Sequence, residues 1–213
     1  MLDLLDLVAP LQCGGCGVPA TRWCPACAAA LAVEPGEPLV ISPRIDPEVP
    51  VFALGRYTGV RRQAVLALKE RGRADLVTPL AHALAVGLHR LWCWGMVETP
   101  LTIVPAPTRR SAARRRGGDP IARIAHAAVA ANPDVTVTAA LRMRALARDS
   151  VGLDSSARER NIAGRVRLRG PRPDTEVLVV DDVVTTGATA RESVRVLRAA
   201  GVRVAAVLAI AAA

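Results

Sequence analysis

The sequence predicts an α/β protein: a parallel β-sheet flanked by helices, with a small cysteine-containing module near the start of the chain. Three observations support this prediction. Short apolar runs alternate with segments of helical periodicity, which is typical of parallel sheets with helical crossovers. Residues 177–180 are one leucine and three valines, followed by two aspartates and a Thr/Gly loop. Two Cys-x-x-Cys pairs stand close together before the first apolar strand.

Length and composition limit the possibilities further. The chain has 213 residues, enough for one sizeable core plus a small module. Apolar residues make up 51% of the chain and aromatic residues only 2%, so we expect a core of alanine, valine and leucine. The net charge of +9 comes almost entirely from arginine, since Lys69 is the single lysine. This balance favours polyanionic partners such as pyrophosphate or nucleic acid, and an arginine-rich surface without a partner is the equally weighted alternative.

The apolar segments argue against secretion and membrane insertion. Residues 1–8 contain Asp3 and Asp6 and no basic residue, unlike a signal peptide. Residues 204–213 are strongly apolar, but they fall short of the roughly 20 residues that a spanning helix needs. We therefore expect a soluble, cytoplasmic protein.

The two cysteine pairs are Cys13 with Cys16 and Cys24 with Cys27. Each pair can place two thiolates on one tetrahedral ion, and together they close a four-thiolate site without an open coordination position. This pattern predicts a structural zinc ion in a module of residues 1–35. Two disulfides are the alternative, and a cytosolic location argues against them. Cys93 stands alone between two tryptophans, and we expect it in the core.

Residues 36–50 are rich in proline and are expected to connect this module to the main domain, residues 51–213. The main domain begins with a predicted strand at residues 51–57, a helix at residues 60–71 and a second helix at residues 76–92. In the first helix the periodicity places Val65 and Leu68 toward the core. It places the following side chains toward solvent: Arg61, Arg62, Lys69 and Arg71.

The next strand, residues 101–105, leads into a basic loop with Arg109 and Arg110. Ligands bind beyond the carboxyl ends of strands in open α/β sheets, so these arginines are candidates for binding pyrophosphate, with solvated surface arginines as the alternative. The densest positive cluster follows and is the candidate nucleic-acid surface: Arg114, Arg115 and Arg116. A helix at residues 120–131 and a strand at residues 135–139 come next.

Residues 141–161 lack apolar periodicity and are rich in charge. We expect a long mobile segment with a helical start, and such segments often close over ligand sites. A short strand at residues 166–168 precedes the central motif. After the motif we expect a helix at residues 190–200 and a last strand at residues 202–210.

The central motif joins two carboxylates to a loop of small residues. Asp181 and Asp182 end the predicted strand, and paired carboxylates suit the two hydroxyls of a ribose or a divalent metal ion. The loop opens a helix, so its backbone N–H groups and the helix dipole suit an anion. The loop residues are Thr185, Thr186, Gly187, Ala188 and Thr189. The alternative is a buried strand whose acidic end only caps the following helix.

Residues 177–189 resemble the phosphoribosyl-pyrophosphate (PRPP) motif of type I phosphoribosyltransferases. The whole chain is similar to the ComF family, in which a phosphoribosyltransferase-like domain follows a four-cysteine zinc module, and which is linked to DNA uptake in competent bacteria. The order of segments agrees with that family: the cysteine pairs, residues 68–73, residues 104–107, the arginine cluster, residues 158–161 and the PRPP motif. Residues 116–120 and 149–153 depart from its usual pattern.

This resemblance implies a type I phosphoribosyltransferase fold that binds PRPP together with Mg²⁺. Asp181 and Asp182 would hold the ribose hydroxyls, and residues 185–189 would hold the 5′-phosphate. The implied activity is transfer of the phosphoribosyl group to an acceptor that the sequence does not identify. A protein that senses PRPP or a nucleotide and binds single-stranded DNA without turnover is the second possibility, and an inactive scaffold is the third.

Overall fold

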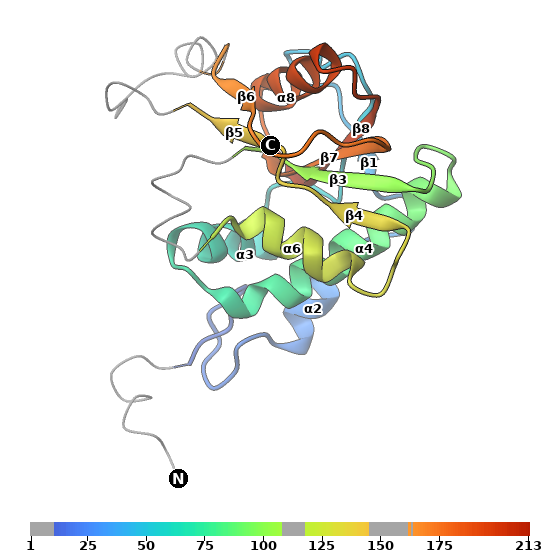
Figure 1. The fold of residues 1–213 in the computed structure, drawn as a ribbon. Helices are drawn as coiled ribbons and strands as arrows, with labels where there is room; N and C mark the ends of the chain where they lie inside the picture. The colour runs from blue at the N-terminus through green and yellow to red at the C-terminus, as the bar shows by residue number, and fades with distance from the viewer. Residues whose placement is uncertain (1–10, 108–117, 145–161, 163) are drawn as a thin grey trace.

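The computed structural model describes residues 11–107, 118–144, 162 and 164–213. Its centre is a six-stranded sheet with the strand order β1-β2-β8-β7-β3-β4 (Figure 1). Neighbouring strands are parallel except for β1 and β2, which are antiparallel. The strands are β1 (Leu39–Val40), β2 (Val51–Ala53), β3 (Leu101–Pro105), β4 (Val135–Val137), β7 (Glu176–Val184) and β8 (Val204–Ala212). The predicted α/β class with a mostly parallel sheet is confirmed.

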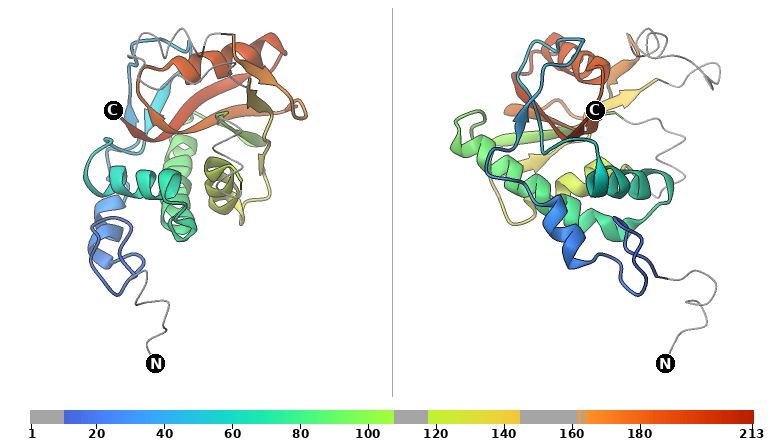
Figure 2. Two further views of the ribbon diagram at one scale, coloured as in Figure 1. Left: turned by 90° about the vertical axis from the view of Figure 1, so that its left-hand side faces the viewer. Right: turned by 180° about the vertical axis from the view of Figure 1, so that it is seen from behind.

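Helices cover both faces of the sheet. Helix α8 lies on one face, and the other helices of the main domain lie on the opposite face (Figures 1 and 2). The helices of the main domain are α3 (Gly59–Glu70), α4 (Val77–Cys93), α6 (Pro120–Val129) and α8 (Ala188–Ala199). A single 3₁₀ turn, η1 (Ala74–Leu76), joins α3 to α4.

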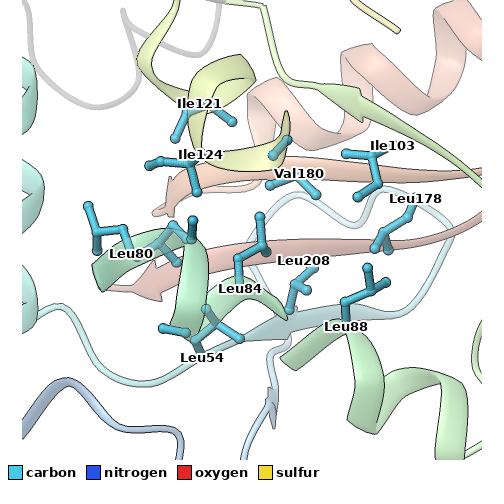
Figure 3. Packing of buried hydrophobic residues seen from close by; sticks show 14 of the residues in the cluster. Leu54, Leu80, Leu84, Leu88, Ile103, Ile121, Ile124, Leu178, Val180 and Leu208 are labelled. Atoms are coloured by element: carbon cyan, nitrogen blue, oxygen red, sulfur yellow. The ribbon is translucent and has the colours of Figure 1, made fainter. Parts of the chain in front are cut away.

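The alternation of side chains along β7 divides the core into two layers. Leu178 and Val180 belong to the layer that packs against α3, α4 and α6. Figure 3 shows both residues on the side of the sheet that faces α4 and α6. Val177 and Val179 belong to the second layer, which includes residues of α8. Leucine, valine and alanine dominate both layers, as the composition predicts.

The central strand is longer than predicted. β7 continues to Val184, because β8 continues beside it and Val183 and Val184 stay in register with Ala211 and Ala212. Both aspartates therefore lie within the strand rather than at its end. Helix α8 begins at Ala188, two residues before the predicted start.

Two side chains of α3 contradict the predicted orientation. Val65 and Leu68 are buried as predicted, but Arg61 is also buried, with 6% of its surface exposed. Its guanidinium lies 3.4 Å from the carbonyl oxygen of Leu31 and 3.8 Å from the carboxylate of Glu37. Lys69 is half-buried and turns toward β7. Helical periodicity cannot reveal either direction, because both partners come from distant parts of the chain.

The cysteine-containing module packs against the main domain. Its helix, α2 (Pro25–Leu31), contributes Leu31 to the larger core layer, and Val33 follows it there. A Cβ atom added at Gly14 would lie 2.6 Å from Cδ2 of Leu76. The module and the sheet domain therefore share one core.

The proline-rich connection is also packed against the main domain. Its strand β1 pairs with β2, and the backbone N–H of Ile45 donates a hydrogen bond of 2.8 Å to the carbonyl oxygen of Thr186. The connection thus reaches the loop of the central motif.

A separate hairpin is formed by β5 (Leu141–Met143) and β6 (Val166–Leu168). Residues 141–143 are thus a strand, and the predicted helical start is wrong, because the residues paired with them come from β6. The rest of the predicted mobile segment, residues 145–161, lies outside the described residues. Leu141 and Val166 are buried in the core layer of α8, while Arg142 and Arg167 are exposed.

Cys93 is exposed, so the prediction that it lies in the core is wrong. It is the last residue of α4 and lies beyond the last buried side chain of that helix, Leu91. The neighbouring Trp92 and Trp94 are each 44% exposed. Among the described residues, no helix has the length and apolar character needed to cross a membrane.

Candidate functional site

The loop between β7 and α8 lies at the carboxyl end of the parallel sheet, and it requires a glycine. Gly187 has a φ angle of 86°, in the left-handed region that favours glycine. A Cβ atom at this position would lie 2.8 Å from Cβ of Pro43 and would overlap the carbonyl oxygen of Ile45. The left-handed backbone at Gly187 and the proline-rich connection packed against it together fix the shape of this loop.

A cavity of about 220 Å³ opens beside the loop. Its lining includes one carboxylate and the whole predicted loop: Asp181, Thr185, Thr186, Gly187, Ala188 and Thr189. These six predicted site residues therefore meet at one cavity. Asp182, which the sequence groups with Asp181, is not among the residues that line it.

The start of α8 gives this cavity an electropositive end. The first N–H groups of an α-helix have no partner within the helix, and they carry the positive end of its dipole. The first turn of α8 contains no acidic residue, and its N-cap is Gly187, which has no side chain to cap these groups. The hydroxyl oxygen of Thr186 accepts a hydrogen bond of 3.4 Å from the backbone N–H of Ala188. An anion can bind at this end of the helix.

Asp181 faces the cavity from the strand side. Its Oδ1 atom accepts a hydrogen bond of 2.8 Å from the backbone N–H of Asp182. Burial and the negative charge of Asp182 raise the pKa of Asp181 from 3.8 to about 8, while that N–H and the ammonium group of Lys69 oppose the increase. Asp119, the N-cap of α6, adds a smaller increase. The protonation of this carboxyl group therefore responds to pH near neutrality.

Asp182 is anchored within the protein. Its Oδ2 atom lies 2.6 Å from Nζ of Lys69, and its Oδ1 atom accepts a hydrogen bond of 2.6 Å from the backbone N–H of Val183. Only 11% of the Asp182 side chain and 32% of the Lys69 side chain are exposed. The two adjacent aspartates therefore have different surroundings, which the sequence motif does not distinguish.

Lys69 is the cation beside the site that sequence reasoning missed, since it was assigned to the solvent side of its helix. One signal was available, because it is the single lysine of an arginine-rich chain. The candidate pyrophosphate residues Arg109 and Arg110 lie outside the described residues. The candidate nucleic-acid residues Arg114, Arg115 and Arg116 lie outside them as well.

The four cysteines of the N-terminal module converge as predicted. The sulfur atoms of Cys13, Cys16, Cys24 and Cys27 all lie within 4.8 Å of one another. Four sulfurs at about 2.3 Å from one tetrahedral zinc ion lie about 3.8 Å from one another. The sulfurs of Cys16 and Cys24 are 3.7 Å apart, well beyond the roughly 2.05 Å of a disulfide bond. All four are free cysteines, and the cluster can hold one metal ion.

The surroundings of the sulfurs also suit a cation. Burial raises the pKa of Cys13, but the backbone N–H groups of Cys16, Cys24 and Gly15 outweigh this effect and lower the pKa from 9.0 to about 6. Burial and the neighbouring thiols raise the pKa of Cys27. A metal ion would stabilise all four thiolates together, and structural sites of this kind couple metal binding to folding.

The fold and these two sites define an α/β protein with a six-stranded, mostly parallel sheet, a cavity at its carboxyl edge and an N-terminal four-cysteine cluster. Compared with protein-family models and with curated proteins, the chain matches none of them.

Proposed function

We propose that this protein binds PRPP with Mg²⁺ and transfers its phosphoribosyl group to a nucleophilic acceptor. The observation that carries the proposal is the meeting of Asp181 with the loop 185–189 at one cavity, at the carboxyl edge of the sheet. This is the edge at which open α/β sheets bind their ligands. The resemblance to the PRPP motif and to the ComF family supports the same ligand.

The cavity formed by the described residues suits a sugar phosphate. Sites for drug-sized ligands have volumes of about 300–1,000 Å³, and this cavity has about 220 Å³. The 5′-phosphate would bind to the N–H groups at the start of α8 and to the hydroxyls of Thr185, Thr186 and Thr189. The ribose hydroxyls would bind to Asp181. Mg²⁺ would arrive as part of the ligand, bound to its pyrophosphate oxygens.

In the proposed reaction, the bond between the anomeric carbon and the pyrophosphate oxygen breaks, and a bond from that carbon to the acceptor forms. Pyrophosphate leaves with the bonding electron pair, and the acceptor loses a proton to solvent. Positive charge develops on the ribose in the transition state. The carboxylate of Asp181 would stabilise this charge, so catalysis depends mainly on positioning and electrostatics.

Turnover is tested by incubating the protein with labelled PRPP, Mg²⁺ and a panel of purine and pyrimidine bases. We expect pyrophosphate release that depends on one class of base. Saturable PRPP binding without pyrophosphate release for any base would contradict turnover. The protein would then be a sensor that binds PRPP without transferring its phosphoribosyl group.

The proposal includes a structural zinc ion at the four-cysteine cluster. The spacing of the sulfurs and the absence of an open coordination position support this assignment. Metal analysis of protein purified without chelator tests it, with one zinc ion per chain as the expected result.

A second candidate function is binding of single-stranded DNA, and one feature of the β5–β6 hairpin favours it. Arg142 and Arg167 face each other across the two strands. Arg144 and Arg169 are exposed beyond them. Within the described part of the chain, no hydrogen bond or ion pair involves these four guanidinium groups. Like charges that face each other across strands are unfavourable, so this surface would gain from a polyanion.

Fluorescence anisotropy with a labelled oligonucleotide tests this candidate. The variant Arg142→Gln/Arg167→Gln should bind more weakly, and the slope of log affinity against log salt should become less steep by about 1.4. The matched control is Arg198→Gln/Arg203→Gln, which removes two arginines already paired with Glu48 and Glu176. Equal losses in both variants would mean that only net charge matters.

A further inference from the structure

The ion pair between Lys69 and Asp182 connects α3 to the ligand cavity through a short series of polar contacts. Nζ of Lys69 lies 2.6 Å from Oδ2 of Asp182. The backbone N–H of Asp182 in turn donates a hydrogen bond of 2.8 Å to Oδ1 of Asp181. Asp181 lines the cavity, whereas Asp182 does not. A contact on α3 is therefore transmitted to the carboxylate that faces the ligand.

The contacts of Asp182 hold it as a support. One of its oxygens accepts from the N–H of Val183 and the other pairs with Lys69, so both are occupied inside the protein. The anchored side chain of Asp182 therefore holds the backbone of the same residue in place. Its N–H group, which orients Asp181, is held with it.

We propose that Lys69 is a positioning residue of the ligand site, which acts through Asp182 to fix the orientation and the charge of the Asp181 carboxylate. This inference rests on the proposed function, in which Asp181 meets the ribose. Lys69 would not touch the ligand. It would balance the negative charge of Asp182. The ionised form of Asp181 would then not lie beside an uncompensated carboxylate on the adjacent residue.

The charges around Asp181 show why one lysine matters. Among the described residues, Asp182 and Asp119 act on this carboxyl group as negative charges, and Lys69 is the cation that opposes them. Within the described part of the chain, loss of Lys69 would leave Asp181 with the negative charges of Asp182 and Asp119. The ionised form would then be reached only at higher pH.

The test compares Lys69→Met with Lys69→Arg, which keeps the positive charge, in PRPP binding with Mg²⁺ from about pH 6 to about pH 9.5. We expect the midpoint of the pH profile to move upward by roughly one unit in Lys69→Met and to return toward the wild-type value in Lys69→Arg. The control is Arg71→Met, which removes an exposed cation two residues away. Weaker binding at every pH with an unchanged midpoint would overturn the proposal, because a merely structural role predicts that result.

The single lysine also allows a test without mutation. An amine-specific acetylating reagent modifies the amino group of Lys69 and the terminal amine. Acetylation therefore removes the positive charge of Lys69, the single lysine of the sequence. Reductive methylation keeps the charge and is the matched control. We expect the acetylated protein to behave as Lys69→Met and the methylated protein as wild type. Identical pH profiles of the two modified proteins would contradict the proposal.

Failure of this inference is distinguishable from failure of the proposed function. If the wild-type protein binds no PRPP, the proposed function fails. In that case, ¹³C NMR of the Asp181 carboxyl group in the ligand-free protein still decides the role of Lys69. We expect its titration to move to higher pH in Lys69→Met, and an unchanged titration would overturn the inference.

Discussion

The backbone N–H of Ile45 donates a hydrogen bond to the carbonyl oxygen of Thr186, at a distance of 2.8 Å. This bond joins the proline-rich connection to the loop that lines the cavity. Nearby, Nη1 of Arg191 on α8 donates a hydrogen bond of 2.7 Å to the carbonyl oxygen of Asp46. The connection therefore supports the candidate phosphate-binding loop. A substitution in either segment should alter the conformation of the other.

Gly187→Ala should damage both stability and ligand binding. The substitution combines an unfavourable φ angle with an overlap between the new Cβ and the carbonyl oxygen of Ile45. We expect a loss of about 2–4 kcal/mol in the free energy of unfolding, measured by urea denaturation. The control Gly201→Ala has a similar φ of 74° with its nearest neighbour 4.0 Å away, and should lose about 1 kcal/mol. Equal losses in the two variants would show that the contact with Ile45 is unimportant.

Removal of the proposed zinc ion from the four-cysteine cluster should destabilise the whole protein, because Leu31 and Val33 from this part of the chain belong to the main core. We expect both a chelator and Cys16→Ser to lower the thermal midpoint by several degrees, corresponding to about 2–4 kcal/mol. Cys93→Ser is the control, since Cys93 is exposed and outside the cluster. If protein purified without chelator contains no zinc, or if removal of the zinc leaves the midpoint unchanged, the assignment of a structural zinc ion fails.

The stability of the protein should fall as pH rises toward 8. Asp181 has a pKa of about 8 in the folded protein, compared with an ordinary value of 3.8. Between these values the folded state binds more protons than the unfolded state, so the free energy of unfolding decreases with increasing pH. Asp181→Asn removes this contribution and should be more stable than wild type at pH 8.

Urea denaturation at several pH values checks this prediction. Asp174→Asn, which removes an exposed carboxylate, is the control and should follow the wild-type profile. The prediction is wrong if wild type and Asp181→Asn keep the same difference in stability at every pH.

Arg61→Ala should lower the free energy of unfolding strongly, although arginine side chains usually lie at the surface and tolerate substitution. Arg61 is 6% exposed, and its guanidinium contacts the carbonyl oxygen of Leu31 and the carboxylate of Glu37. Truncation would remove the donor to the carbonyl oxygens of Leu31 and Ala32 and the cation beside Glu37, and we expect a loss of about 2–4 kcal/mol in the free energy of unfolding. The neighbouring Arg62 is exposed and serves as the control, with an expected loss below about 1 kcal/mol for Arg62→Ala. Similar values for both variants would contradict the structural role of Arg61.

The elements that a local sequence pattern identifies were predictable. The strands Leu101–Pro105 and Val166–Leu168 occur where predicted, because a short apolar run marks each of them without knowledge of the strand that pairs with it. The convergence of the four cysteines was predictable for a similar reason, since the spacing of each pair places two sulfurs together.

Features that depend on distant partners were not predictable. The extension of β7 requires β8 beside it, and the burial of Arg61 requires acceptors from Leu31 and Glu37. The different surroundings of Asp181 and Asp182 depend on Lys69, which is more than 100 positions earlier in the sequence. A sequence motif shows that two carboxylates are adjacent, but only the packing shows which one reaches the cavity.

The most direct test of the central claim is a calorimetric titration of PRPP and Mg²⁺ into the wild-type protein and Asp181→Asn at pH 8, with Asp174→Asn as the charge-matched control. We predict one ligand per chain for wild type and control, and affinity at least roughly tenfold lower for Asp181→Asn. Equal affinity in all three proteins, or no binding to wild type, would contradict the account.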